Sequence, residues 1–340
     1  MTFTRRNFLR GSGAVLTLPG LATAATGGAR RTQFANAGVA NGRGDGVKTS
    51  GARMVDIGDG HQVWVKQVGH GPVPVLLLHG GPGMSHFYLE CFEEFLPVDE
   101  FRFFYYDQLG CGFSDRPEDL KLWTVDRYRE EVEAVRIALG LDQFILFGHS
   151  WGGMLGMEYA FRYQQHLSAL VVSNMTAGVA AYDKHANELR AQLPAEVQKA
   201  MKAFEDKGET KSAGYTQLLM DHLYARHFCR LNPWPEPVSR TMRTMNASVY
   251  ETMQGPDEFN IVGNFKDWDR WNDLHLIKTR TLLMVGRHDT MSPQDIARMG
   301  QLIPNARAVV CENGSHMAMY DDQQFYFESL LRFLRAPLHV

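Results

Sequence analysis

Residues 144–153 read FILFGHSWGG, four apolar residues and a glycine that lead into a serine framed as G-x-S-x-G. A short apolar run of this kind is typical of a buried strand. Gly148 and Gly152 flank Ser150, and residues without a side chain let a strand turn sharply into a helix where packing is tight. The stretch therefore predicts a turn that holds the Ser150 hydroxyl above the end of a strand.

Three fixed positions of this kind recur by chance in about one chain in ten of this length, so the surrounding sequence has to support the motif. The apolar run within the motif, residues 144–147, is one of six without alternation; the others lie on both sides of it and cover residues 73–78, 101–106, 169–173, 281–285 and 308–311. Most are separated by stretches with helical spacing of apolar residues, over residues 125–139, 152–163, 293–301 and 321–334. This order predicts an α/β fold with a mostly parallel central sheet flanked by helices.

A hairpin pattern precedes these runs. Residues 53–57 and 62–67 alternate between apolar and polar side chains, and Gly58-Asp59-Gly60 supplies a turn between them. We expect two antiparallel edge strands here.

The stretch between residues 173 and 281 is far longer than the usual connection between neighbouring strands of such a sheet. It predicts an inserted helical cap over residues 175–275, with the core in two parts, 51–174 and 276–340. The expected cap helices cover residues 183–193, 195–207, 212–229 and 237–252.

The N-terminus resembles a twin-arginine export signal, because Arg5 and Arg6 precede a modestly apolar run over residues 11–25. The run is too short to span a bilayer. We expect residues 1–24 to be a signal peptide and residues 25–50, which contain almost no large apolar side chain, to be a flexible linker. The expected partner is the Tat export machinery, and the expected location is periplasmic or secreted without stable membrane insertion after cleavage. A disordered basic N-terminus is the alternative.

The composition is that of an ordinary globular protein: 340 residues, 44% apolar and 21% charged. A net charge of −3 gives no electrostatic reason to expect nucleic acid or an anionic membrane as a partner. The four cysteines are scattered without C-x-x-C pairing, so free thiols are expected rather than a zinc or redox site. No sequence feature indicates an oligomeric state.

A serine hydroxyl is a poor nucleophile at neutral pH and needs a base and an acid that orients the base. His316 follows the last apolar run and is the predicted base, while Asp289 follows the run before it and is the predicted acid. Asp321 and Glu312 are weaker candidates for the acid. Taken singly, Asp289 can equally be a helix cap and His316 a surface histidine. The order Ser, Asp, His favours catalysis.

Residues 79–83 read HGGPG and follow an apolar run, as a loop that presents backbone N–H groups to an oxyanion would. The N–H groups of Gly81 and Trp151 are the predicted pair of donors. The alternative, a simple turn, would be preferred if the serine motif were missing. A phosphate loop is excluded because the segment lacks the Gly-Lys-Ser/Thr ending.

Together these motifs resemble the proline iminopeptidases, through HGGPG, YYDQLGCGFSDRP, GHSWGG, RHFCRLNPWPEP, MQGPDEFNIVGNFKDWD, GRHD and GSHM. The resemblance runs from about Met54 to Leu334 and extends to bacterial L-amino acid amidases and the tricorn-interacting aminopeptidase. It implies an α/β-hydrolase fold with a helical cap. It also implies release of an N-terminal residue, often proline, from a short peptide, amide or arylamide through an acyl-enzyme on Ser150. No metal or cofactor is implied.

The resemblance places the carboxylate that binds the substrate amine at Glu258, in the segment GPDEF. A free α-amine is protonated near neutral pH, so a desolvated carboxylate would hold it and discriminate against blocked amines. A solvated loop glutamate is the alternative.

Two positions depart from the family pattern. Thr290 stands where many relatives have a second glutamate, and His149 stands where relatives often have glycine or glutamine. The first departure leaves open an L-amino acid amidase or a cap-bearing esterase or lactonase without a free-amine requirement. A binding protein with slow turnover is the alternative outside enzymology.

Overall fold

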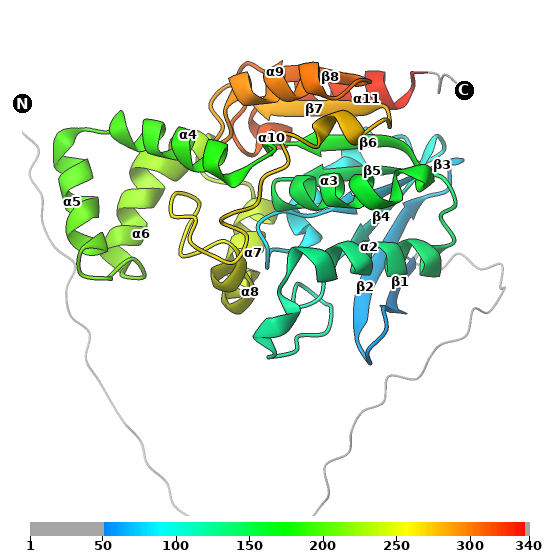
Figure 1. Ribbon diagram of the computed structural model, residues 1–340, viewed down its shortest axis with the longest axis horizontal. Coiled ribbons are helices and arrows are strands. Elements are labelled where there is room, and N and C mark those ends of the chain that lie inside the picture. The colour runs from blue at the N-terminus through cyan, green and yellow to red at the C-terminus, as the bar shows by residue number, and fades with distance from the viewer. Residues whose placement is uncertain (1–50, 337–340) are drawn as a thin grey trace, which may run out of the picture. The chain divides into compact units, whose positions relative to one another are not determined.

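The computed structural model describes residues 51–336 (Figure 1). The expected signal peptide and linker, residues 1–24 and 25–50, lie outside the described residues, as do residues 337–340. Within residues 51–336, no helix is long and apolar enough to cross a membrane.

An eight-stranded sheet in the order β1-β2-β4-β3-β5-β6-β7-β8 confirms the predicted mostly parallel architecture. The strands are β1 (Gly51–Asp56), β2 (Gln62–Gly69), β3 (Val73–Leu78), β4 (Phe101–Tyr106), β5 (Phe144–His149), β6 (Leu167–Ser173), β7 (Thr281–Gly286) and β8 (Ala306–Cys311). β5 and β7 are buried at every residue, which explains their unbroken apolar runs. One detail of the hairpin prediction was wrong: only β1 is an edge strand, because β2 pairs antiparallel with both β1 and β4.

Helices cover both faces of the sheet. α2 (Val125–Leu139) and α3 (Trp151–Tyr163) lie on one face, where Phe144 of β5 contacts Tyr159 of α3. Side chains alternate between faces along a strand, so Phe147 points to the other face. There it contacts Phe92 of α1 (Phe92–Phe95), which in turn contacts α11 (Gln323–Leu334).

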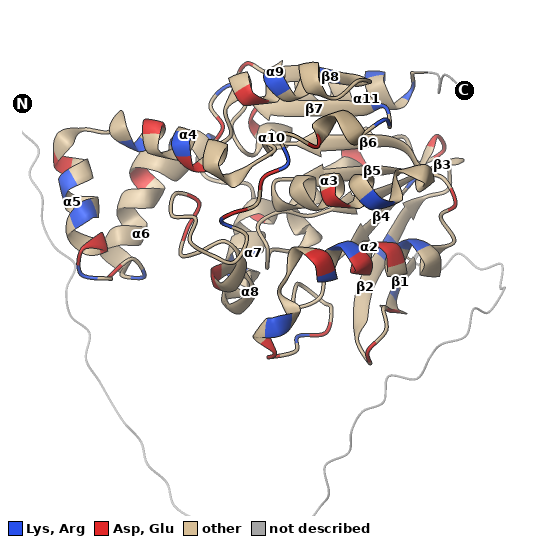
Figure 2. Cartoon of the chain, viewed as in Figure 1, with Lys and Arg blue, Asp and Glu red and all other residues tan. Residues whose placement is uncertain are grey.

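Further helices pack against the C-terminal strands and the connections between elements. These are α9 (Pro293–Leu302), α10 (Ala318–Asp321) and the 3₁₀ turns η1 (His86–Leu89), η2 (Leu120–Leu122), η3 (Gln164–His166) and η5 (Leu274–Leu276). The expected single helix over residues 321–334 was wrong, because α10 ends at Asp321 and Asp322 has non-helical angles before α11 begins. Figure 2 shows acidic and basic residues interspersed along α2, where Arg129 pairs with Asp126 and Arg136 with Glu133.

Helices between β6 and β7 lie together beside the sheet (Figure 1). They are α4 (Val179–Ala191), α5 (Ala195–Glu205), α6 (Ala213–Leu219), the π-helical turns η4 (Met220–Phe228), α7 (Glu236–Thr244) and α8 (Ala247–Met253). We call this helical insertion the cap. The expected helix over 237–252 is in fact two helices, because Met245 is extended and the Asn246 side chain caps α8 by accepting from the Ser248 N–H.

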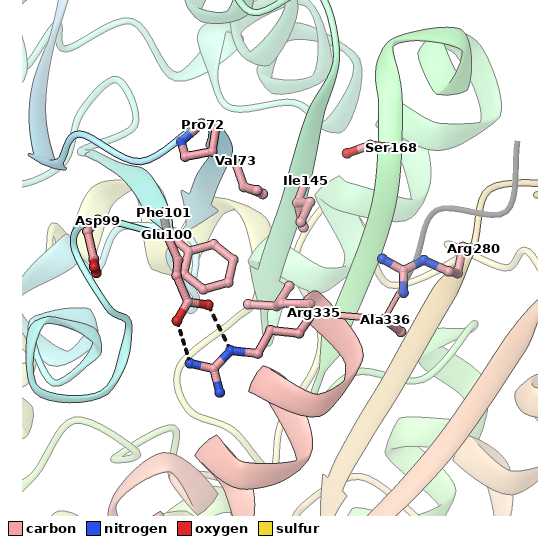
Figure 3. Close-up of a pocket in the computed structure, with 11 residues that line it drawn as sticks. Pro72, Val73, Asp99, Glu100, Phe101, Ile145, Ser168, Arg280, Arg335 and Ala336 are labelled. Atoms are coloured by element: carbon pink, nitrogen blue, oxygen red, sulfur yellow. Dashed lines mark hydrogen bonds and ion pairs between the residues drawn. The ribbon is translucent and has the colours of Figure 1, made fainter.

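A cavity of about 470 Å³ lies at the end of the sheet where the parallel strands begin (Figure 3). It is lined by Val73, Phe101, Ile145 and Arg280, and an ion pair of 2.8 Å between Glu100 and Arg335 stands beside it. The serine turn follows the carboxyl end of β5, so this cavity is at the opposite edge from the predicted site.

Candidate active site

Ser150 occupies the tight turn between β5 and α3 with φ 55° and ψ −126°, a backbone conformation that few non-glycine residues adopt. Its N–H donates to the Ser173 oxygen at 2.8 Å, which fixes the turn on the neighbouring strand. Both glycines of the motif are required by space. A Cβ on Gly148 would lie 2.0 Å from the Gly152 oxygen, and one on Gly152 would lie 2.3 Å from the Leu78 oxygen.

His316 and Asp289 meet at the carboxyl ends of β8 and β7. The His316 Nδ1–H donates to Asp289 Oδ1 at 2.7 Å, and both side chains are buried. This bond places the proton on Nδ1 and leaves Nε2 with a lone pair, the arrangement that a general base needs. The cap holds the base loop in place, because the His316 N–H donates to the His227 oxygen at the end of η4 at 2.9 Å.

Neutral donors surround the Asp289 carboxylate. Asn174 Nδ2 donates to Oδ2 at 2.6 Å, and the Met291 N–H donates to Oδ1 at 3.1 Å. Burial alone would raise the pKa of Asp289, but the neighbouring His316 charge and these donors hold it below its ordinary value. Burial likewise disfavours the charged form of His316, yet the Asp289 carboxylate raises its pKa above the ordinary value of 6.5.

The weaker candidates for the acid are used elsewhere. Asp321 accepts from the main-chain N–H groups of Ser315 at 2.9 Å and Arg230 at 3.0 Å. Glu312 forms an exposed ion pair with Arg287 at 2.7 Å. The His316 ring thus has its carboxylate partner in Asp289.

The HGGPG loop lies against the serine turn, because a Cβ on Gly80 would be 2.8 Å from the Ser150 Cβ. The Gly80 N–H is already used, since it donates to the Tyr88 hydroxyl at 2.6 Å. Within residues 51–336, the main-chain N–H groups of Gly81 and Trp151 have no acceptor. They are therefore available to an oxyanion. The Trp151 indole is fixed separately by Gln108 Oε1 at 2.7 Å.

The Ser150 hydroxyl has no hydrogen-bond partner in the described part of the chain, His316 Nε2 included. Catalytic contacts of this kind often tighten only when a substrate binds. The serine and the base are nevertheless linked through the neighbouring residue, because the His149 Nε2–H donates to the His316 main-chain oxygen at 2.8 Å.

Comparisons with known proteins agree with this geometry. The sequence matches the family model of the alpha/beta hydrolase fold over residues 73–323. It is 44% identical to the proline iminopeptidase of Flavobacterium johnsoniae over 277 residues, which cover 80% of this chain and 93% of that protein. This chain belongs to the proline iminopeptidase family. A relative of the same name from Elizabethkingia meningoseptica is 44% identical over 279 residues, 81% and 94% of the two chains.

A solved structure of the family supports the assignment. The crystal structure of proline iminopeptidase from Mycobacterium smegmatis matches with a TM-score of 0.77 and 33% identity, covering 83% of this chain and 97% of that one. The α/β-hydrolase fold expected from the sequence is confirmed.

The family's amine-binding carboxylate is expected at Glu258, which lies after α8 and is 4% exposed. Its Oε1 accepts from the Tyr250 hydroxyl at 2.9 Å and its Oε2 from the Tyr182 hydroxyl at 2.6 Å. The Glu258 charge is one of the influences that raise the pKa of His316, so the two groups lie within electrostatic reach of each other.

Glu258 has no cationic partner among residues 51–336, since both its side-chain contacts are neutral hydroxyls. A buried carboxylate without a counter-ion destabilises the folded protein. Removing one partner of a buried ion pair typically costs about 3–5 kcal/mol of folding free energy. A cationic ligand would remove that cost. The solvated loop glutamate that the sequence left open is thus not what the structure contains.

Thr290 is fully buried against the pair of His316 and Asp289. Its hydroxyl donates to Asp289 Oδ1 at 3.2 Å and lies 3.3 Å from His316 Nδ1. Thr290, which stands where the resemblance predicts a second glutamate, therefore supports the Asp289 carboxylate.

Sequence reasoning missed Asn174 and did not assign Tyr182 or Tyr250 to the Glu258 carboxylate. Asn174 is 115 positions from Asp289, and Tyr182 is 76 positions from Glu258, so no local pattern joins them. One weak signal was available for Asn174, which directly follows a predicted strand end. In the described part of the chain, no group of three or more His, Cys, Asp or Glu residues is placed to hold a metal ion.

Proposed function

We propose that this chain is a serine aminopeptidase that releases the N-terminal residue, proline favoured, from short peptides, amides or arylamides. The observation that carries the proposal is the buried Glu258 carboxylate, which faces no cation and lies within electrostatic reach of His316. A protonated substrate amine would supply the missing positive charge. An enzyme that acts only on blocked or uncharged acyl groups would have no use for this buried charge.

Binding the amine at Glu258 would place the first carbonyl of the substrate beside Ser150. His316 Nε2 takes the proton from the Ser150 hydroxyl as the oxygen attacks this carbonyl. The N–H groups of Gly81 and Trp151 stabilise the oxyanion, and Asp289 stabilises the imidazolium that forms. His316 then gives its proton to the leaving amine. Water repeats the same steps on the acyl-enzyme and releases the free amino acid.

The test is a panel of aminoacyl arylamides, led by proline and alanine, each paired with its N-acetylated form and compared with a simple aryl ester. We expect fast hydrolysis of the free-amine compounds and little hydrolysis of the acetylated ones. Equal turnover of both forms would contradict recognition of the amine and favour an esterase or lactonase. Faster release of ammonia from amino acid amides than of arylamines would favour an L-amino acid amidase.

Glu258→Gln keeps the shape of the side chain and removes its charge. We expect kcat/KM on free-amine arylamides to fall by about 30- to 1000-fold, corresponding to about 2–4 kcal/mol, because the substrate ammonium loses its partner. Hydrolysis of the aryl ester, which carries no ammonium, should stay nearly unchanged when it is measured at a pH well above the His316 pKa, where the influence of the Glu258 charge on that base no longer matters. Glu251→Gln is the matched control, because Glu251 lies on α8 and pairs with Lys211 at the surface. A Glu258→Gln variant that loses the ester and the arylamide equally would contradict the proposed role.

We further propose export through the twin-arginine pathway, on the strength of Arg5 and Arg6 before an apolar run. Replacing both with lysine in the full chain should leave the protein in the cytoplasmic fraction. An unchanged periplasmic fraction would contradict this route.

A further inference from the structure

His149 directly precedes the nucleophile, is 1% exposed and takes no part in the reaction steps above. Its ring lies between the base and the HGGPG loop, residues 79–83. Nε2 is 2.8 Å from the His316 main-chain oxygen, and Nδ1 is 2.9 Å from the Tyr88 hydroxyl. The Tyr88 oxygen in turn receives the Gly80 N–H at 2.6 Å. Gly80, Tyr88, His149 and His316 thus form one continuous chain of hydrogen bonds.

The direction of every bond in this chain is determined by its two ends. A main-chain carbonyl can only accept, so His149 must carry its proton on Nε2. Nδ1 of a neutral ring then accepts, and the Tyr88 hydroxyl must donate to it. The Tyr88 oxygen therefore has a lone pair for the Gly80 N–H. Each member has one arrangement that satisfies all its partners, and such fully satisfied buried networks rigidify a site.

We propose that His149 is a positioning residue that, through Tyr88, holds the oxyanion loop and the base at one spacing about Ser150. The proposal rests on the catalytic roles proposed above for Ser150, His316 and Gly81. At one end of the chain, the bond to Gly80 orients the loop whose next N–H is the oxyanion donor. At the other end, the bond to the His316 carbonyl fixes the main chain that carries the base.

His149 is suited to this role because it stays neutral. Burial, together with the neighbouring His316 charge, lowers the pKa of His149 to about 3. The Nδ1 lone pair is therefore kept throughout the range in which the enzyme would work, and no second positive charge competes with the His316 imidazolium. Tyr88 is 0% exposed, so water has no access to replace its hydroxyl.

The test uses three variants of the full chain. Tyr88→Phe deletes the central hydroxyl, and His149→Leu deletes both ring nitrogens. His149→Gln restores the pattern, since its amide can donate to the His316 carbonyl while its oxygen accepts from Tyr88. The matched control is Tyr159→Phe, because Tyr159 is equally buried on α3 and its hydroxyl donates to Glu133.

The primary readout is the rate at which a fluorophosphonate reacts with Ser150, because this rate needs the base and the oxyanion donors but no peptide substrate. We expect about 10- to 100-fold slower reaction in Tyr88→Phe and His149→Leu, since small displacements of catalytic groups cost this much. His149→Gln should recover the rate to within about fivefold, and Tyr159→Phe should match the unchanged chain.

The second readout separates positioning from general loosening of the site. In the same variants, kcat on proline arylamide should fall by the factor seen for the fluorophosphonate, while inhibition by free proline should keep its strength, because Glu258 is untouched. Tyr88→Phe reacting within twofold of the unchanged chain, or losing proline binding in parallel, would overturn the proposal. If His149→Leu does not fold, the fluorophosphonate rates of Tyr88→Phe and His149→Gln test the proposal without it. If the unchanged chain reacts with the fluorophosphonate but does not hydrolyse proline arylamide, the proposed aminopeptidase function is wrong, and the fluorophosphonate rates of the variants still test the positioning role.

Discussion

Ser150→Ala is expected to reduce hydrolysis of proline arylamide by about 10⁴- to 10⁶-fold while the protein stays folded. The range follows from serine hydrolases in which the nucleophile has been removed, where the residual rate comes from binding and the oxyanion donors alone. Substrate should still bind, because the Glu258 carboxylate and the cap are unchanged. Folding is expected to survive, because the Ser150 hydroxyl makes no hydrogen bond within residues 51–336 and alanine removes only that oxygen.

Ser168→Ala is the matched control for this loss. Ser168 lies in β6 and lines the cavity at the opposite end of the sheet. Its replacement should leave kcat/KM within about twofold of the starting value, as expected for a surface change away from the site. If Ser150→Ala kept more than about a hundredth of the activity, the reaction would not proceed through this serine.

Asp289→Asn is expected to lower kcat by about 10⁴-fold, because an amide in this position can donate to Nδ1 and so select the wrong histidine tautomer. Three donors converge on the carboxylate, from Asn174, Met291 and Thr290. An asparagine cannot accept from all of them and from His316 in the present arrangement. Kinetics on proline arylamide measures the loss.

The pH profile gives the same variant a second readout. The base must be neutral to act, and Asp289 raises the pKa of His316 above 6.5, so kcat/KM should fall as the pH drops through a value above 6.5. Removing the carboxylate takes away the largest influence that raises the His316 pKa, so the acid limb of Asp289→Asn should move to lower pH. Asp321→Asn is the control, because Asp321 contacts Ser315 and Arg230 and is the weakest of the carboxylates that raise the His316 pKa, so its loss should move the limb far less. If the acid limb of the pH profile moved more in Asp321→Asn than in Asp289→Asn, Asp321 rather than Asp289 would be the acid that orients His316.

Much of the fold could be predicted from the sequence, because the patterns that indicate it lie within single strands, helices and turns. The central parallel strands are buried along most of their length, which gives unbroken apolar runs, and β3 and β4 have the expected bounds. Ser150, Asp289 and His316 each follow such a run, so strand order alone brings them to one edge of the sheet. The tight turn at Ser150 could be predicted from Gly148 and Gly152, because a side chain at either position would collide with the backbone.

The rest depended on contacts that no local pattern records. The cap helix expected over residues 237–252 breaks because Asn246 caps α8, and its N–H also donates to Gly83 at 2.8 Å. The tyrosine hydroxyls on Glu258 come from α4 and α8, on either side of π-helical turns that were expected to be regular helix. The chain from Gly80 through Tyr88 and His149 to the His316 carbonyl includes one direct bond between residues 167 positions apart, His149 and His316.

The most direct test of the central claim is labelling with the diphenyl phosphonate analogue of proline, which forms a stable adduct only with an activated serine. Mass spectrometry of the digested protein would locate the adduct, and the labelling rate would be compared with that of the N-acetylated analogue. We expect the adduct on the peptide that contains Ser150, formed at least about tenfold faster when the amine is free, because Glu258 holds the ammonium. An adduct on another residue, or equal rates for the free and the acetylated compound, would contradict the account.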